Sequence, residues 1–148
     1  MDRGAARKLA AEKPEKETTV RHLISVEGVM RALARRLDGD EDLWALTGLF
    51  HDLDQDLTGE DPERHAYIAA DWLREAGVDE RVINGVLAHA HEQYRKETMD
   101  RAIVHADAIA GLLRVRHKIQ AGDPDDFLVR TMDEIASVRS SVDFPCRS

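Results

Sequence analysis

Trp44-Ala-Leu-Thr-Gly-Leu-Phe-His-Asp-Leu53 is the stretch that decides how this chain is interpreted. Its apolar residues recur at the spacing of a helix that faces a core. An imidazole and a carboxylate, His51 and Asp52, nevertheless stand side by side near its end. Asp40 is placed to cap the helix, and the polar residues 54–61 follow it. Because buried polar groups are normally satisfied, this pair indicates a partner elsewhere in the fold.

The rest of the chain also has the patterns of helices, and no convincing strand alternation is present. An amphipathic segment at 5–12 stops near Pro14. A long helix, capped by Thr18 or Thr19 and ended by Gly39, carries an apolar stripe that includes Leu37. Four more helices are predicted. One starts at Asp61-Pro62, one starts after Asp79, one spans about 98–120 and one spans about 125–138. The sequence therefore predicts an all-α fold, a compact bundle of about six to seven helices.

The composition is that of one ordinary globular domain. Hydrophobic residues make up 43% and charged residues 34% of the 148 residues. We expect one domain over 1–148, with a motif-bearing core at about 18–120 and a C-terminal helix at about 125–138. The sequence has no signal peptide and no apolar run of membrane-spanning length, so a cytoplasmic location without membrane association is expected.

Charge and cysteine content restrict the partners. The net charge of -8 argues against a large nucleic-acid footprint, because such binding depends on basic surface, but it leaves a small anionic substrate open. With Cys146 as the single cysteine, a chain can build neither an internal disulfide nor a thiolate metal cluster. Any metal would need nitrogen and oxygen ligands.

Six polar side chains fall on or beside apolar faces of five predicted helices: His22, His51, Asp52, His65, His89 and Asp107. A lone histidine that faces a core is usually only hydrogen-bonded there. Each such group would cost about 1–3 kcal/mol if it were buried without a partner, so a common partner is the simplest explanation for all six. A divalent cation is such a partner, because imidazole nitrogens and carboxylate oxygens are its ligands.

The His51-Asp52 pair and its surroundings resemble the signature of the HD superfamily of metal-dependent phosphohydrolases. His22, followed by Ser25-Val-Glu-Gly-Val-Met-Arg-Ala-Leu-Ala34, precedes the pair, and Asp107 follows it in the order that this family uses. Two further stretches look like the additional histidine motifs of its small stand-alone members, namely Asp61-Pro-Glu-Arg-His65 and Leu87-Ala-His-Ala-His-Glu92. The likeness covers about residues 5–115.

The resemblance implies a helical fold with its site between helices and a divalent metal ion as cofactor. By this resemblance the four metal ligands are His22, His51, Asp52 and Asp107, and the additional histidines match at His65 and at His89 or His91. The donor set does not distinguish Fe, Mn, Ni, Co, Zn and Mg. We expect one ion in the four-ligand site, while His65 and His89 either line the cleft or complete a second site that Asp52 would bridge.

Catalytic and substrate-binding roles are less closely tied to motifs. Asp52 and Asp54 are the candidate catalytic carboxylates, but Asp54 could equally cap a helix end or loop instead of handling a proton. Candidate phosphate-binding cations lie beside the motifs or beyond Asp107, although each could be ordinary solvated surface: Arg21, Arg64, Arg114, Arg116 and Lys118.

The favoured function is hydrolysis of a phosphate monoester or diester on a small phosphorylated molecule such as a nucleotide. A metal would lower the pKa of a bound water and neutralise charge that develops on the phosphate. One alternative is a degenerate HD domain that keeps its metal and serves as a binding or regulatory module. A further alternative is a di-iron oxygenase.

Overall fold

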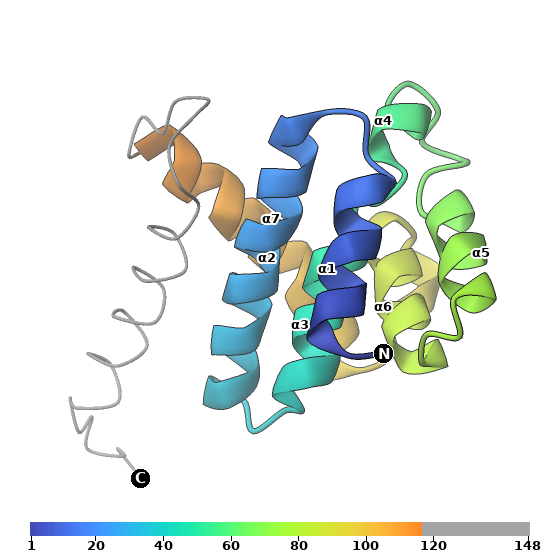
Figure 1. Cartoon of the computed structure of the whole chain (residues 1–148). Coiled ribbons are helices and arrows are strands. Elements are labelled where there is room, and N and C mark those ends of the chain that lie inside the picture. The colour runs from blue at the N-terminus through green and yellow to red at the C-terminus, as the bar shows by residue number, and fades with distance from the viewer. Residues whose placement is uncertain (117–148) are drawn as a thin grey trace, which may run out of the picture.

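The chain folds as a bundle of helices (Figure 1). In this computed structural model the backbone is described for residues 1–116 and the side chains for residues 1–113. These residues contain no strand, and their helices are α1 (Arg3–Glu12), α2 (Glu17–Arg36), α3 (Glu41–Phe50), α4 (Gln55–Thr58), α5 (Tyr67–Glu75), α6 (Glu80–Ala90), the 3₁₀ helix η1 (Glu92–Tyr94) and α7 (Thr98–Arg116). The prediction of an all-α fold is confirmed.

Helix α3 lies at the centre of the bundle and packs against α1, α2, α6 and α7 (Figure 1). Leu49 and Phe50 belong to a core cluster that also contains buried residues of α1, α5 and α6. Trp44, near the other end of α3, belongs to a second cluster with residues of α2 and α7. The C-terminal end of α3, which His51 follows, therefore lies in the first cluster, and the N-terminal part of α3 lies in the second.

Small residues let α3 approach its neighbours closely. A Cβ atom at Gly48 would lie 2.6 Å from the backbone oxygen of Val26 in α2. On the other side, a Cβ atom at Gly85 of α6 would lie 2.6 Å from the Thr47 methyl group. Close packing of this kind leaves no room for an added methyl group. It brings the end of α3 next to both α2 and α6.

The ends of α2 differ from the prediction. Neither Thr18 nor Thr19 is the N-cap, because the helix starts at Glu17 after Lys16, which makes no side-chain cap bond. The Asp56 carboxylate instead accepts hydrogen bonds from the backbone N–H of Lys16 and from the Thr19 hydroxyl. At the other end, Asp38 rather than Gly39 has the left-handed backbone, with φ at 57°.

Two further details explain the end of α2. The Gly39 N–H donates to the carbonyl of Ala34 at 2.8 Å, as in a Schellman motif with Asp38 in the left-handed position. Asp can adopt this conformation at moderate cost. Leu37 is 52% exposed, so the buried stripe of α2 does not extend to it.

The predicted helix start at Asp61-Pro62 is wrong. Residues 62–66 form a turn, and α5 begins only at Tyr67, after Ala66 with a left-handed φ of 71°. The cause is Asp54, whose carboxylate accepts hydrogen bonds from the backbone N–H groups of Ala66 and Ala69. A carboxylate from a distant segment thus caps α5 in place of a local residue.

The caps predicted for α3 and α6 are confirmed, because Asp40 and Asp79 each accept hydrogen bonds from the first turn of the helix that follows. The helix predicted at 98–120 starts at Thr98 and is described to Arg116. The predicted helix at 125–138 lies outside the described residues. None of the helices in the described part has both the length and the apolar character required to cross a membrane.

We expect Gly48→Ala to lower the free energy of unfolding by about 1–3 kcal/mol, because the new methyl group would overlap the α2 backbone. The matched control is Gly111→Ala in α7, where an added Cβ meets nothing within 4 Å and alanine should stabilise the helix by up to about 1 kcal/mol. Urea denaturation followed by circular dichroism measures both effects. Equal midpoints for the two variants would contradict the close crossing of α2 and α3.

Candidate metal centre

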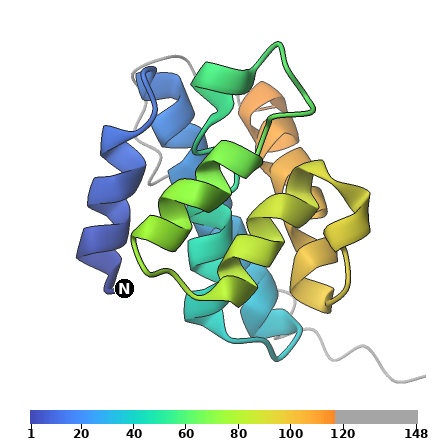
Figure 2. The ribbon, with the colours of Figure 1, turned by 90° about the vertical axis from the view of Figure 1, so that its right-hand side faces the viewer.

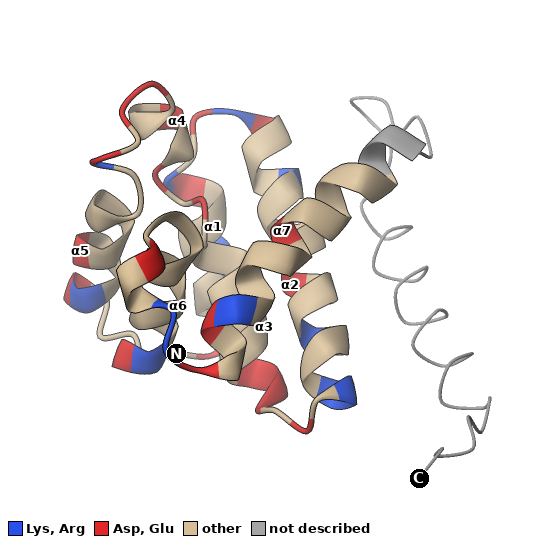
Figure 3. Cartoon of the chain, turned by 180° about the vertical axis from the view of Figure 1, so that it is seen from behind, with Lys and Arg blue, Asp and Glu red and all other residues tan. Residues whose placement is uncertain are grey.

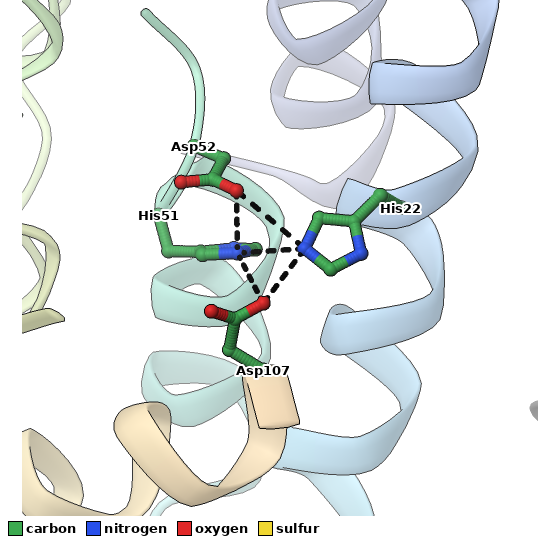
Figure 4. Close-up of side chains that lie close together, drawn as sticks. All are labelled: His22, His51, Asp52 and Asp107. Carbon is green, nitrogen blue, oxygen red and sulfur yellow. Dashed lines mark hydrogen bonds and ion pairs between the residues drawn. The ribbon is translucent and has the colours of Figure 1, made fainter. Parts of the chain in front are cut away.

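Four polar side chains from three helical segments converge on one point (Figure 4). His22 comes from the N-terminal part of α2, His51 and Asp52 directly follow α3, and Asp107 lies in α7. Each offers one ligand atom, and these atoms all lie within 4.8 Å of one another. The four residues that the sequence predicted as metal ligands are thus brought together, and we call them the four-residue cluster.

The separations inside the four-residue cluster suit a single bound ion. The Nε2 atom of His22 lies 3.1 Å from Nε2 of His51 and 2.9 Å from Oδ1 of Asp107. The Oδ2 atom of Asp52 lies 3.3 Å from Nε2 of His51 and 3.5 Å from Nε2 of His22. With ligand bonds of about 2.0–2.2 Å, neighbouring ligand atoms lie about 3.0 Å apart in octahedral and about 3.4 Å apart in tetrahedral coordination. The donor atoms therefore fit a divalent cation.

The protein fixes which nitrogen of His51 faces the cluster. Its side chain is fully buried, and Nδ1 lies 2.7 Å from the carbonyl oxygen of Gly48. In the neutral ring Nδ1 must be the donor in this contact, which leaves the lone pair on Nε2. A backbone carbonyl behind a ligating imidazole is the usual way in which proteins orient such a ligand. This contact leaves Nε2 of His51 available to an ion in the four-residue cluster.

A second group of three possible ligands adjoins the first and consists of Asp52, His65 and His89. While Oδ2 of Asp52 faces the four-residue cluster, its Oδ1 lies 3.1 Å from Nε2 of His65 and 3.7 Å from Nε2 of His89. The two oxygens of Asp107 also face different residues, because Oδ1 contacts His22 while Oδ2 lies 3.3 Å from Nε2 of His89. Both carboxylates therefore connect the two groups.

The structure separates the two adjacent candidate histidines. His89 in α6 points into the centre, whereas His91 follows α6 in an extended backbone conformation. The Nε2 atom of His91 lies 2.7 Å from the carbonyl oxygen of His65 and not near either carboxylate of the centre. His89 is therefore the histidine that belongs to the second group.

Asp54 is held away from solvent by hydrogen bonds. Its side chain is fully buried, and besides the two α5 N–H groups it contacts Nδ1 of His65 at 2.8 Å. With both oxygens engaged, Asp54 does not face the open side of the centre. The structure thus corresponds to the capping alternative for Asp54, with the added effect that this carboxylate orients the His65 ring.

Charge interactions set the protonation of the centre. Burial lowers the pKa of His51, but Asp52 and Asp107 outweigh this effect and raise it to about 10. Burial likewise opposes the charging of His65, while Asp52 and Asp54 raise its pKa to about 9. Burial raises the pKa of the Asp52 and Asp107 carboxyls, but the facing histidines hold both well below their usual range. Without a metal, the centre therefore pairs ionised carboxylates with protonated His51 and His65, whereas burial lowers the pKa of His89.

The two candidate phosphate-binding cations whose side chains are described, Arg21 and Arg64, each pair with an acidic residue of their own segment. Arg21 pairs with Glu17 on the same helix, and Arg64 pairs with Asp61 at 3.9 Å with most of its side chain exposed. Arg114 and Arg116 belong to α7, but their side chains and all of Lys118 lie outside the described part. Sequence reasoning missed Tyr67 and Tyr94, which lie beside His91 and follow no periodic pattern that would have marked them.

A rise in pH should affect the metal-free and the metal-loaded protein in opposite ways. The folded-state pKa values of His51 and His65 exceed the ordinary value of 6.5, so their stabilisation is complete below about pH 6.5 and is lost as the pH rises toward 9–10. Metal binding instead requires neutral imidazoles and tightens with pH.

We therefore expect Mn²⁺ to raise the melting temperature above that of EDTA-treated protein, and this difference should increase from about pH 6 to about pH 8.5. The exposed His105 of α7 supplies a control, since His105→Ala should show the same increase. A difference that stays constant over this range would contradict the protonation pattern.

Comparison with known proteins gives a consistent result. The family model described as HD domain matches residues 19–134, which is most of the chain. Ribonuclease Y 2 of Levilactobacillus brevis is 28% identical over 123 residues, covering 82% of this chain and 22% of the relative. Ribonuclease Y of Fervidobacterium nodosum is 31% identical over 123 residues, covering 81% of this chain and 23% of the relative.

A third relative, Ribonuclease Y of Sulfurovum sp., is 26% identical over 127 residues, covering 86% of this chain and 25% of the relative. The chain thus spans about a quarter or less of the length of these relatives. No solved structure matches it significantly. The matched region contains the His51-Asp52 pair and every other residue of the two ligand groups. The chain belongs to the HD domain family.

Proposed function

We propose that this chain is a metal-dependent phosphohydrolase that acts on a phosphate ester of a nucleotide or short oligonucleotide. The observation that carries the proposal is a four-residue cluster that is anchored in the core and open on one side. His51 is fully buried, whereas the side chains of His22 and Asp107 are 21% and 34% exposed. A catalytic metal site must keep a position open to water and substrate, while a structural site is closed by protein ligands.

A divalent cation held by His22, His51, Asp52 and Asp107 would supply a nucleophilic water at neutral pH and neutralise charge on the phosphate. In our proposal the carboxylates of Asp52 and Asp107 provide the negative charge that retains the cation. The His51 ring, fixed by the Gly48 carbonyl, sets the position of the cation relative to the core. Asp52 thus serves the reaction as a ligand, in agreement with its place among the candidate catalytic residues.

His65 is the residue that we assign to proton handling. Its Nδ1 is held by Asp54, and its Nε2 faces Asp52 at 3.1 Å. In the metal-free centre these carboxylates raise its pKa to about 9, and in our proposal the ring keeps this proton when the metal is bound and gives it to a leaving oxygen. We therefore assign Asp54 the role of positioning His65, not of contacting the substrate.

The substrate class rests on the relatives and on charge. The names of the relatives describe enzymes that act on RNA, which supports a nucleotide phosphodiester or monoester here. Apart from Asp52 and the buried Asp54, residues 52–63 contain four acidic residues and no lysine or arginine, and Figure 3 shows acidic residues along the loop at α4. Such an edge repels a long polyanion, so a small substrate is favoured over an extended nucleic acid.

Removing a ligand should remove the metal. We expect His51→Ala and Asp52→Ala, purified without chelators or a nickel column, to contain less than about a tenth of the metal of the unaltered protein, because each removes a principal ligand. Both should also melt at a lower temperature, since a ligand bound only by the native state stabilises it. Elemental analysis measures the content and identifies the ion.

The same preparations test the function. Hydrolysis of adenosine 5′-monophosphate and of a short oligoribonucleotide should be lost in both variants and retained in His105→Ala, which changes an exposed histidine outside both groups. Full metal content in both variants would refute the site. Full metal content in the unaltered protein without turnover of any phosphate ester would refute the hydrolase and favour a binding or regulatory domain, and dioxygen-dependent turnover would favour an oxygenase.

We expect one tightly bound ion per chain in the four-residue cluster. The second group has only three ligands, and its two histidines are neutral ligands that add no charge to offset a second dication. Titration of metal-free protein with Mn²⁺, followed by calorimetry, counts the sites. Two tight sites, of which one disappears in His65→Ala and in His89→Ala, would replace this expectation with a two-metal centre that the carboxylates bridge.

A further inference from the structure

Three aromatic rings pack together beside the metal centre. The rings of Tyr67 and His91 lie with their centroids 4.5 Å apart at an interplanar angle of 33°. Tyr94 contacts both rings edge-on, with centroids 6.2 Å from Tyr67 and 6.4 Å from His91. We call Tyr67, His91 and Tyr94 the aromatic shelf. Tyr67 begins α5 and His91 directly follows α6, and Figure 2 shows the N-terminal end of α5 next to the C-terminal end of α6.

The aromatic shelf is fixed to the second ligand group by backbone contacts. The His91 ring contacts the backbone carbonyl of His65 at 2.7 Å, and His65 itself faces Asp52. Tyr67 follows His65 by two residues, so their Cα atoms are at most about 7 Å apart. Between them, Ala66 is held in its left-handed conformation by a hydrogen bond to Asp54. The exposed ring and the proton-handling ring are therefore set at a constant spacing.

Core packing does not account for the position of Tyr67. It is 36% exposed and is the only tryptophan, tyrosine or phenylalanine among the exposed large hydrophobic residues of the described part. The other aromatic residues of α3 and α5, Trp44, Phe50 and Trp72, are buried or pack against the core. An exposed ring that is held by its neighbours, two residues from His65 of the second ligand group, is suited to stacking with a base.

We propose that the aromatic shelf binds the base of the nucleotide whose phosphate lies at the metal centre, an inference that rests on the proposed function. The shelf offers ring faces and edges, and base stacking on aromatic side chains is tolerant of base identity. It distinguishes a nucleotide from a sugar phosphate that presents the same anionic group to the centre. Tyr67, as the exposed member, is the specificity-determining residue.

The test compares probes with and without a base on the metal-loaded full chain. Isothermal titration calorimetry should give an affinity for adenosine 5′-monophosphate about 10-fold higher than for ribose 5-phosphate. In Tyr67→Leu this ratio should fall toward one, whereas Tyr67→Phe, which keeps the ring, should retain it. The matched control is Leu37→Ala, at an exposed apolar residue directly after α2 and outside the aromatic shelf. Equal affinities in the unaltered protein, or a ratio that survives Tyr67→Leu, would overturn the shelf.

Free adenosine separates this proposal from the proposed function, because it carries no phosphate. Binding of adenosine, followed by saturation-transfer NMR and abolished in Tyr67→Leu, supports the shelf even if no phosphate ester is hydrolysed, a result that would refute the hydrolase alone. If adenosine 5′-monophosphate and ribose 5-phosphate are hydrolysed with equal KM and adenosine does not bind, base binding by the aromatic shelf is refuted, while the hydrolase proposal is not. If neither adenosine nor a phosphate ester binds, both proposals fail.

Discussion

The complete burial of His51 is the constraint on which the rest of the structure depends. With Nδ1 satisfied by the Gly48 carbonyl, only Nε2 remains, and a buried imidazole nitrogen without a partner is costly. Besides the adjacent Asp52, its neighbours are His22 and Asp107, which come from α2 and α7. Because Gly48 has no side chain, α2 packs closely against α3, and Nε2 of His22 lies 3.1 Å from Nε2 of His51. Gly85 likewise allows α6 to pack closely against Thr47 of α3. The close packing of α2 and α6 against α3 thus serves both the core and the polar centre.

Asp54 extends this constraint to the helix that supports the aromatic shelf. One carboxylate holds the His65 ring, locks the left-handed backbone at Ala66 and caps α5. A strained conformation of this kind persists only where surrounding contacts determine it, and such conformations cluster at functional sites. The turn at 62–66, although its sequence would suit the first turn of a helix, places His65 beside both Asp52 and Asp54.

The features that could be predicted from the sequence are those that depend on residues close together in the chain. The apolar repeat and the caps Asp40 and Asp79 lie within the helices that they define, and these predictions are confirmed. The starts of α2 and α5 could not be predicted, because Asp56 and Asp54 satisfy them from segments distant in the sequence. The ligand groups followed from an excess of polar residues on apolar faces and from a family resemblance. The choice of His89 over His91 depends on where α6 ends, and the shelf depends on contacts between helices, so neither had a periodic signal.

The charges of the centre explain how so many polar groups are accommodated in a small helical domain. Two carboxylates whose pKa values lie far below their usual range, Asp52 and Asp107, face four imidazoles from four segments of the chain. In the absence of an ion, protons on His51 and His65 balance these carboxylates. A divalent cation in the four-residue cluster would replace the proton on His51, because a ligating imidazole must be neutral. The carboxylates that a metal needs are thus kept ionised and in position by the facing imidazoles before the metal arrives.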